Sequence, residues 1–198
     1  LHHDLGCIGA EVNRSAIERQ LNLLIDMGAN AIRVTHNPGS SELLDLCAET
    51  GLLVVEEFFD CWTSSKKTYD FARYYNDNYE KVIETTVKRG INNPSIIMWS
   101  IGNEIIRTSP SYTSEQATTL VNNMKTKIKS LDTTRMVTMG EDVPDNTVAR
   151  ACMELMDVVG VNYGSDSEYR SLRNAYPNFK LYGSETTSAL SSRGVYAR

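Results

Sequence analysis

The feature that most constrains this chain is a regular alternation of amphipathic helices and short apolar strands. The first predicted helix covers residues 13–27, where Ile17, Leu21 and Leu24 fall on one face, and a predicted strand at 31–35 follows it. Further helices are expected over 41–50, 76–89, 114–131, 145–155 and 167–175, and further strands over 52–55, 95–101, 136–139, 157–161 and 179–182. Strict alternation of this kind predicts an α/β fold with a parallel sheet, either doubly wound or closed into a (β/α)8 barrel.

The turns after the strands distinguish these two folds. A doubly wound nucleotide-binding sheet carries a glycine-rich GxGxxG or GxxxxGK[ST] turn, and neither pattern occurs in the sequence. A TIM barrel needs eight strands in roughly 250 residues. This chain has 198 residues with six predicted strands, and its first residues resemble the end of a preceding strand. We therefore predict a (β/α)8 TIM barrel that is incomplete in this chain, with the start of strand 1 and all of strand 8 missing.

Residues 1–198 are expected to form a single domain, a fragment of the barrel of a longer multidomain protein. Without its missing strands the barrel cannot close its hydrogen bonds around the ring, so two sheet edges and part of an apolar interior would be exposed. We therefore expect the segment alone to have little activity and either to associate with itself or to need its missing parts. The sequence leaves open whether the protein forms a homo-oligomer.

The composition argues against several classes of partner. The net charge is −5, from 20 Lys and Arg against 25 Asp and Glu, and Lys66-Lys67 is the main basic cluster, so no nucleic-acid partner is expected. No apolar run approaches ~18 residues, so neither a transmembrane helix nor a membrane partner is expected. His2 and His3 are adjacent and would point to opposite sides of an extended chain, so we expect no metal site, and we expect no cofactor. The location stays open between the bacterial periplasm or exterior and the cytoplasm.

Polar residues gather where the predicted strands end, and in such barrels function lies at the carboxyl ends of the strands. Glu104 and Glu185 each follow an apolar strand, and these would be the fourth and seventh strands of a barrel, facing each other across its opening. Paired carboxyl groups at a barrel mouth suit glycoside hydrolysis, in which one protonates the leaving oxygen and the other attacks the anomeric carbon. The alternative is two unrelated glutamates that cap helices or form salt bridges. The other polar residues at strand ends are His2, His3, Asp4, Arg33, His36, Asn37, Glu56, Glu57, Asp60, Asn103, Glu141, Asp142, Asn162, Tyr163 and Ser184.

The segment 93–104, with the sequence NPSIIMWSIGNE, resembles the acid/base signature of family 2 glycoside hydrolases, the family of the β-galactosidases, β-mannosidases and β-glucuronidases. The segments 2–4, 30–38 and 183–186 resemble further motifs of this family in the same order. The resemblance covers nearly the whole chain and concerns the central catalytic barrel. It implies that β-sandwich domains, absent from this chain, accompany the barrel in the full-length protein.

The resemblance also implies roles for the polar residues. Glu104 would be the general acid/base and Glu185 the nucleophile of a retaining double displacement. Arg33 and Tyr163 would orient Glu185, because a guanidinium favours a neighbouring carboxylate and a phenol donates to it. Asn103 would bind the 2-hydroxyl of the sugar, a contact that strengthens in the transition state.

Other residues are expected to contact the substrate. His2 and His36 match histidines that contact the sugar in the β-galactosidase branch, although histidines satisfied within the loops would give the same pattern. Asp4 and Asn37 lie in the same two segments and are expected at the substrate as well. Trp62, in a loop after a strand, is expected to stack on a pyranose ring, whereas Trp99 lies inside a strand and is expected in the core.

The sequence thus predicts a retaining exo-β-glycosidase that takes oligo- or polysaccharide glycosides as substrates. The histidines favour β-D-galactosides, and a β-glucuronidase or β-mannosidase of the same family is the alternative. A non-catalytic carbohydrate-binding barrel is a further alternative, but such a barrel would be expected to have lost one of its two carboxylates, and both Glu104 and Glu185 are present.

Overall fold

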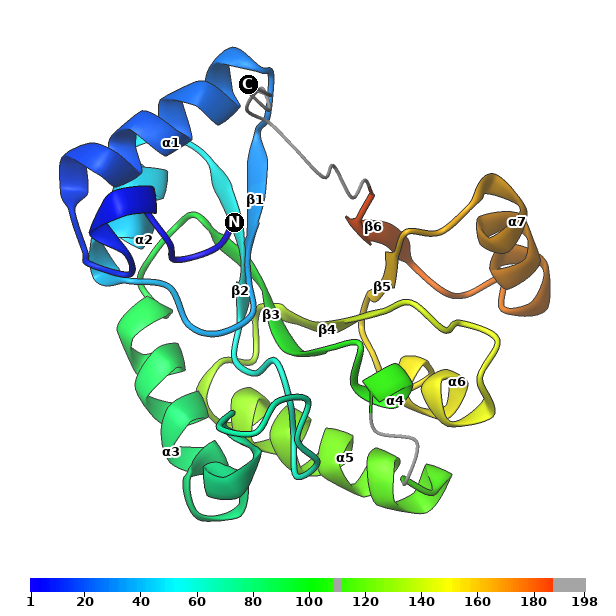
Figure 1. Ribbon diagram of the computed structural model, residues 1–198. Coiled ribbons are helices and arrows are strands. Elements are labelled where there is room, and N and C mark those ends of the chain that lie inside the picture. The colour runs from blue at the N-terminus through cyan, green and yellow to red at the C-terminus, as the bar shows by residue number, and fades with distance from the viewer. Residues whose placement is uncertain (109–111, 187–198) are drawn as a thin grey trace, which may run out of the picture.

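A computed structural model describes residues 1–108 and 112–186 of the chain. It contains a six-stranded sheet whose strands are all parallel and follow one another in sequence order. The strands are β1 (Ala31–Val34), β2 (Leu53–Glu57), β3 (Ile96–Asn103), β4 (Met136–Glu141), β5 (Val159–Asn162) and β6 (Leu181–Glu185). The sheet curves, and the helices lie along its outer side (Figure 1). This arrangement confirms the incomplete (β/α)8 barrel, of which the described residues supply six consecutive strands.

The connections between strands are helical, as predicted. The helices are α1 (Arg14–Asp26), α2 (Ser41–Thr50), α3 (Ala72–Gly90), α4 (Ile105–Thr108), α5 (Ser114–Leu131), α6 (Thr147–Met153) and α7 (Asp166–Ala175), and a short 3-10 helix, η1, covers Gly6–Ile8. The short elements α4 and η1 were not predicted, because one turn leaves no hydrophobic periodicity to detect. None of the helices in the described ranges has the length and apolar character that crossing a membrane requires.

Side chains near the helix starts set two boundaries differently from the sequence prediction. Asn13 caps α1 by accepting a hydrogen bond from the amide of Ala16, so the helix begins at Arg14, one residue after the predicted start. The helix α3 begins four residues earlier than expected, because the Asp70 carboxylate accepts from the amide of Ala72 and the Tyr75 ring is buried against the core. The start of α1 is therefore set by a capping side chain, whereas the start of α3 reflects both a side-chain hydrogen bond and the packing of an aromatic ring.

The two faces of the sheet have different roles. The outer face packs against the helices and forms the main core, with residues such as Val54, Trp99 and Val137. The inner face carries a smaller apolar layer of Val55, Met98 and Val158. Because successive residues of a strand point to opposite faces, a polar layer then follows on the inner side where the strands end. The burial of Trp99 confirms its predicted place in the core.

Leu1 lies beside β1 and continues the sheet by hydrogen bonds. Its amino group donates to the carbonyl of Arg33, and its carbonyl accepts from the amide of Thr35 at 3.1 Å. This is how a neighbouring parallel strand pairs, as expected for the end of the strand that precedes β1 in a barrel. The pairing brings the loop containing His2 and His3 to the carboxyl end of β1.

Candidate active site

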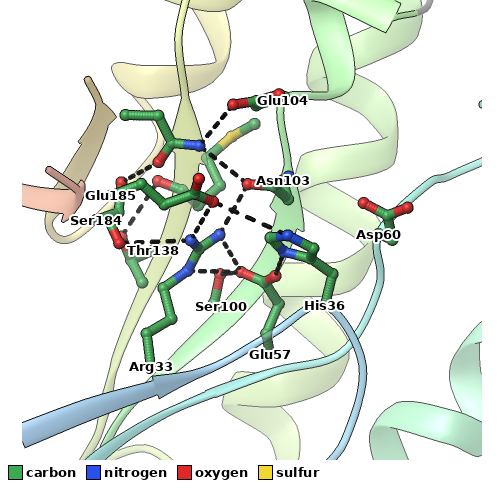
Figure 2. Close-up of polar contacts among 12 residues, drawn as sticks. Arg33, His36, Glu57, Asp60, Ser100, Asn103, Glu104, Thr138, Ser184 and Glu185 are labelled. Atoms are coloured by element: carbon green, nitrogen blue, oxygen red, sulfur yellow. Dashed lines mark hydrogen bonds and ion pairs between the residues drawn. The ribbon is translucent and has the colours of Figure 1, made fainter. Parts of the chain in front are cut away.

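Glu185, at the end of β6, accepts hydrogen bonds from Arg33 on β1, which Figure 2 shows, and from Tyr163, which directly follows β5. Arg33 Nη1 lies 2.8 Å from Glu185 Oε1, and the Tyr163 hydroxyl donates to Glu185 Oε2. Partial burial acts to raise the pKa of Glu185, but the bonds from Tyr163 and Arg33 and the charge of Arg33 outweigh it and lower that pKa below its ordinary value. The arrangement therefore keeps the carboxylate ionised, which a nucleophile requires.

Arg33 is itself fixed by a second carboxylate in the barrel interior. Glu57 Oε2, at the end of β2, accepts from Arg33 Nε at 3.0 Å and from Arg33 Nη2 at 2.7 Å. The hydroxyl of Ser100 on β3 donates to the same oxygen at 2.6 Å. The side chains of Arg33 and Glu57 are 6% and 0% exposed. Burying a charge is costly unless it is paired and hydrogen-bonded, and these two opposite charges satisfy each other. The guanidinium is thus oriented toward Glu185 by its neighbours.

His36 joins the same cluster through Glu57. His36 Nδ1 lies 2.7 Å from Glu57 Oε1, and its Nε2 lies 3.9 Å from Glu185 Oε1. One carboxylate, that of Glu57, therefore orients both the arginine and the histidine beside Glu185.

A chain of amide side chains connects this cluster to Glu104, which follows β3. Asn162 Nδ2 donates to Glu104 Oε1 at 3.0 Å and to Asn103 Oδ1 at 3.0 Å. Asn103 Oδ1 also accepts from Arg33 Nη2 at 2.9 Å. One continuous network therefore runs from Glu185 through Arg33, Asn103 and Asn162 to Glu104. Figure 2 labels Glu185, Arg33, Asn103 and Glu104 of this network.

The network needs a residue without a side chain on β4. A Cβ atom added at Gly140 would lie 2.9 Å from Arg33 Nη2 and 2.9 Å from Asn162 Oδ1. Both atoms belong to groups fixed by several hydrogen bonds, so they could not move away without breaking the network. Glycine at this position thus leaves room for the arginine to reach across the barrel interior.

The predicted residues of the first two segments lie together at the rim. The rings of His2 and His36 meet edge to face with their centroids 5.7 Å apart, and His3 Nε2 lies 3.1 Å from the carbonyl oxygen of Asn37. Asp4 and Asn37 are exposed. The structure therefore brings His2 and His36 together next to Glu185, with Asp4 and Asn37 at the surface.

The structure corrects the prediction for Trp62. Its side chain is fully buried, and its indole nitrogen donates to the carbonyl of Ile101 at 2.8 Å. A ring with no exposed face cannot stack on a sugar, so the expectation that Trp62 binds substrate was wrong. The apolar sequence around it, with Phe58 and Phe59 buried as well, is the signal that could have indicated a core position.

Sequence reasoning gave no role to several residues that build the site. Glu57, Asn162 and Ser184 stood among the polar residues at strand ends but were not assigned a function. Ser100 lies within a strand, and the alternation of inner and outer side chains could have placed it beside Glu57. Lys66 lies in a loop, where it reaches Asp60 Oδ1 at 2.8 Å and the Asn103 carbonyl at 2.6 Å, and no sequence pattern points to it.

Comparisons with known proteins agree with this geometry. Residues 2–180 match the family model for glycosyl hydrolases family 2, TIM barrel domain. The β-galactosidase BoGH2A of Bacteroides ovatus is 36% identical over 223 residues, covering 99% of this chain and 26% of that protein. A solved family 2 glycosyl hydrolase from Bacteroides cellulosilyticus is 37% identical with a TM-score of 0.86, and the match covers 94% of this chain and 23% of that one.

A third relative is more distant. The structure of Bacteroides uniformis β-glucuronidase 2, covalently bound to cyclophellitol-6-carboxylate aziridine, matches with a TM-score of 0.78 and 27% identity over 91% of this chain and 23% of that one. The chain thus spans about a quarter of the length of these relatives. Because the family model matches nearly the whole chain and the fold is that of its barrel, this chain belongs to glycosyl hydrolase family 2, as part of the TIM barrel domain.

Proposed function

We propose that this chain is the catalytic part of a longer, multidomain retaining exo-β-glycosidase that releases terminal β-linked sugars. The observation that carries the proposal is the continuous network between Glu104 and Glu185, which combines two carboxyl groups at one barrel mouth with an arginine that favours the ionised form of one of them. Two carboxyl groups with different environments are what glycoside hydrolysis needs.

The proposed reaction is a double displacement. Glu185 attacks the anomeric carbon while Glu104 donates a proton to the leaving oxygen, and water then releases the sugar with Glu104 acting as base. The covalent adduct in the solved B. uniformis β-glucuronidase 2 supports a covalent course in this family. A crystal structure of the full-length protein should place the two carboxyl groups about 5–5.5 Å apart, whereas a separation of about 8 Å in an undistorted site would indicate an inverting enzyme.

The remaining site residues fit supporting roles in this proposal. Arg33 and Tyr163 would orient Glu185, to which both are hydrogen-bonded. The side-chain amide nitrogen of Asn103 would donate to the 2-hydroxyl of the sugar, since the side-chain oxygen, Oδ1, already accepts from Arg33 and Asn162. His2 and His36 would contact the sugar from the rim, with Asp4 and Asn37 beside them.

We propose β-D-galactosides as the substrates. The 36% identity with the B. ovatus β-galactosidase over nearly the whole chain supports this choice. A second candidate is a β-glucuronide, because the B. uniformis relative with 27% identity is a β-glucuronidase.

The sugar can be tested with nitrophenyl glycosides. We expect the full-length protein to hydrolyse the β-galactoside at least about tenfold faster, by kcat/KM, than the β-glucuronide, β-mannoside and β-glucoside, since single pocket contacts discriminate by about that factor or more. The measurement is release of nitrophenol under identical conditions. A preference for the glucuronide or mannoside would keep the roles of Glu104 and Glu185 but overturn the galactoside proposal.

Tyr163→Phe should shift the pH dependence. The hydrogen bond from Tyr163 helps to lower the pKa of Glu185, so removing it should raise that pKa. Glu185 would then lose its charge at a higher pH as the solution is acidified. A hydrogen bond to a charged group contributes about 1.5 kcal/mol, so the acidic limb of kcat/KM should move up by about one pH unit. Tyr169→Phe is the matched control, since the Tyr169 hydroxyl bonds to the Val161 carbonyl instead. An acidic limb at the wild-type pH in Tyr163→Phe would contradict the assigned role.

A further inference from the structure

Glu104 has an unusual backbone conformation. Its φ angle is 44°, in the left-handed region that residues other than glycine seldom adopt. Such a conformation persists only where the surrounding structure holds it, and such positions cluster at functional sites. The direction of the Glu104 carboxyl therefore depends on what fixes the backbone around it.

The backbone polar groups around Glu104 are bonded on both sides. The amide of Glu104 donates to the Gly140 carbonyl at 2.7 Å. Before it, the carbonyl of Asn103 accepts from Lys66 Nζ at 2.6 Å. After it, the amides of Ile105 and Ile106 donate to one oxygen, Glu141 Oε1, at 2.8 and 3.2 Å. Two side chains distant in sequence thus hold the two peptide units that flank this residue.

Glu141 is costly to keep where it is. It is 0% exposed, lies at the end of β4 on the side of the helices, and within the described residues its Oε2 has no hydrogen-bond partner. Burial raises the pKa of Glu141 to about 8, although the two amides and Lys66 act to lower it. No salt bridge joins it to an Arg, Lys or His in the part of the chain that the structure describes. Its side-chain hydrogen bonds go to the amides of the two residues that follow Glu104.

We propose that Glu141 and Lys66 are positioning residues that hold the backbone on either side of Glu104 and so aim its carboxyl at the leaving oxygen. This inference rests on the proposed acid/base role of Glu104. Proton donation depends on geometry, and a displacement of about 1 Å at a catalytic group can cost about 100-fold in rate.

Leaving groups provide the test, because a dinitrophenolate leaves without a proton and a phenolate needs one. We would measure kcat/KM of the full-length protein for the phenyl and 2,4-dinitrophenyl β-glycosides of its preferred sugar. Glu141→Met should lower the phenyl-to-dinitrophenyl ratio about tenfold or more, since the carboxyl is no longer aimed. Glu141→Gln keeps a side-chain oxygen that can accept from the two amides, so this variant should have the wild-type ratio. Lys66→Met should lower the ratio in the same direction.

Glu56→Met is the matched control. Glu56 is also 0% exposed with one oxygen lacking a partner among the described residues, and burial raises its pKa to about 7, but it bonds to the Gly39 amide and Arg89. The Glu56→Met variant should therefore be less stable but should keep the wild-type phenyl-to-dinitrophenyl ratio. If Glu141→Met does not fold, Lys66→Met decides alone.

Glu104→Ala, measured in parallel, separates the two hypotheses. If it leaves the ratio unchanged, the acid/base assignment itself fails. If it lowers the ratio while Glu141→Met and Lys66→Met leave it at the wild-type value, or lower both substrates equally, the positioning roles are overturned and the acid/base role stands.

Discussion

Glu185→Ala should abolish turnover of every β-glycoside by the full-length protein. The variant loses the group that forms the covalent bond to the sugar, and removing such a nucleophile lowers kcat by a factor on the order of 10⁵ or more. The Arg33 guanidinium and the Tyr163 hydroxyl would remain around the vacated space, since Glu57 holds the arginine independently. Release of nitrophenol from the preferred substrate measures the loss.

Azide identifies the role of the missing carboxylate. A small anion that enters the space left in Glu185→Ala should attack from the same side as Glu185 and give a glycosyl azide of inverted configuration. NMR of the product distinguishes the two anomers. Glu154→Ala, at an exposed position at the end of α6, is the control and should keep wild-type activity. A product of retained configuration from Glu185→Ala would reverse the assignment of the two glutamates.

Glu104→Ala should have an effect that depends on the leaving group. General acid catalysis contributes about 10²–10⁴-fold, so kcat/KM for a phenyl or alkyl glycoside should fall by that factor. For a 2,4-dinitrophenyl glycoside kcat/KM should change little, because it reports the steps up to the covalent intermediate and this leaving group needs no proton. Rates for the two substrates, measured with one protein preparation, provide the comparison.

Azide again gives an independent readout. In Glu104→Ala the anion should attack the covalent intermediate on Glu185 and yield a glycosyl azide of retained configuration, the opposite of the product from Glu185→Ala. Equal losses for both leaving groups would argue that Glu104 supports the structure rather than donating a proton.

Sequence periodicity predicted most of the fold. The six predicted strands and the long helices occur in the structure, with boundaries that shift by a few residues. The clearest shift is β6, predicted at 179–182 and observed at Leu181–Glu185, because pairing with β5 extends the strand beyond its apolar residues. The alternation of strands and helices along the chain indicates a parallel sheet, and this alternation can be read from a single sequence.

The positions of Glu104 and Glu185 could also be predicted, since each follows an apolar strand and parallel strands end at one edge. The sequence could not say how they are connected. Arg33 and Glu185 are 152 residues apart and meet only because the sheet curves to bring β1 and β6 toward each other.

The sequence alone determined that strands and helices alternate and that Glu104 and Glu185 lie at the carboxyl ends of strands. Both features depend only on short-range periodicity and on the direction of the strands. Only the tertiary structure decided that Glu57 orients Arg33 while Glu56 faces the helices, that Trp62 is buried, and that Lys66 and Glu141 flank Glu104. These outcomes depend on register between strands and on loop paths, and a one-residue change in either would point each side chain elsewhere.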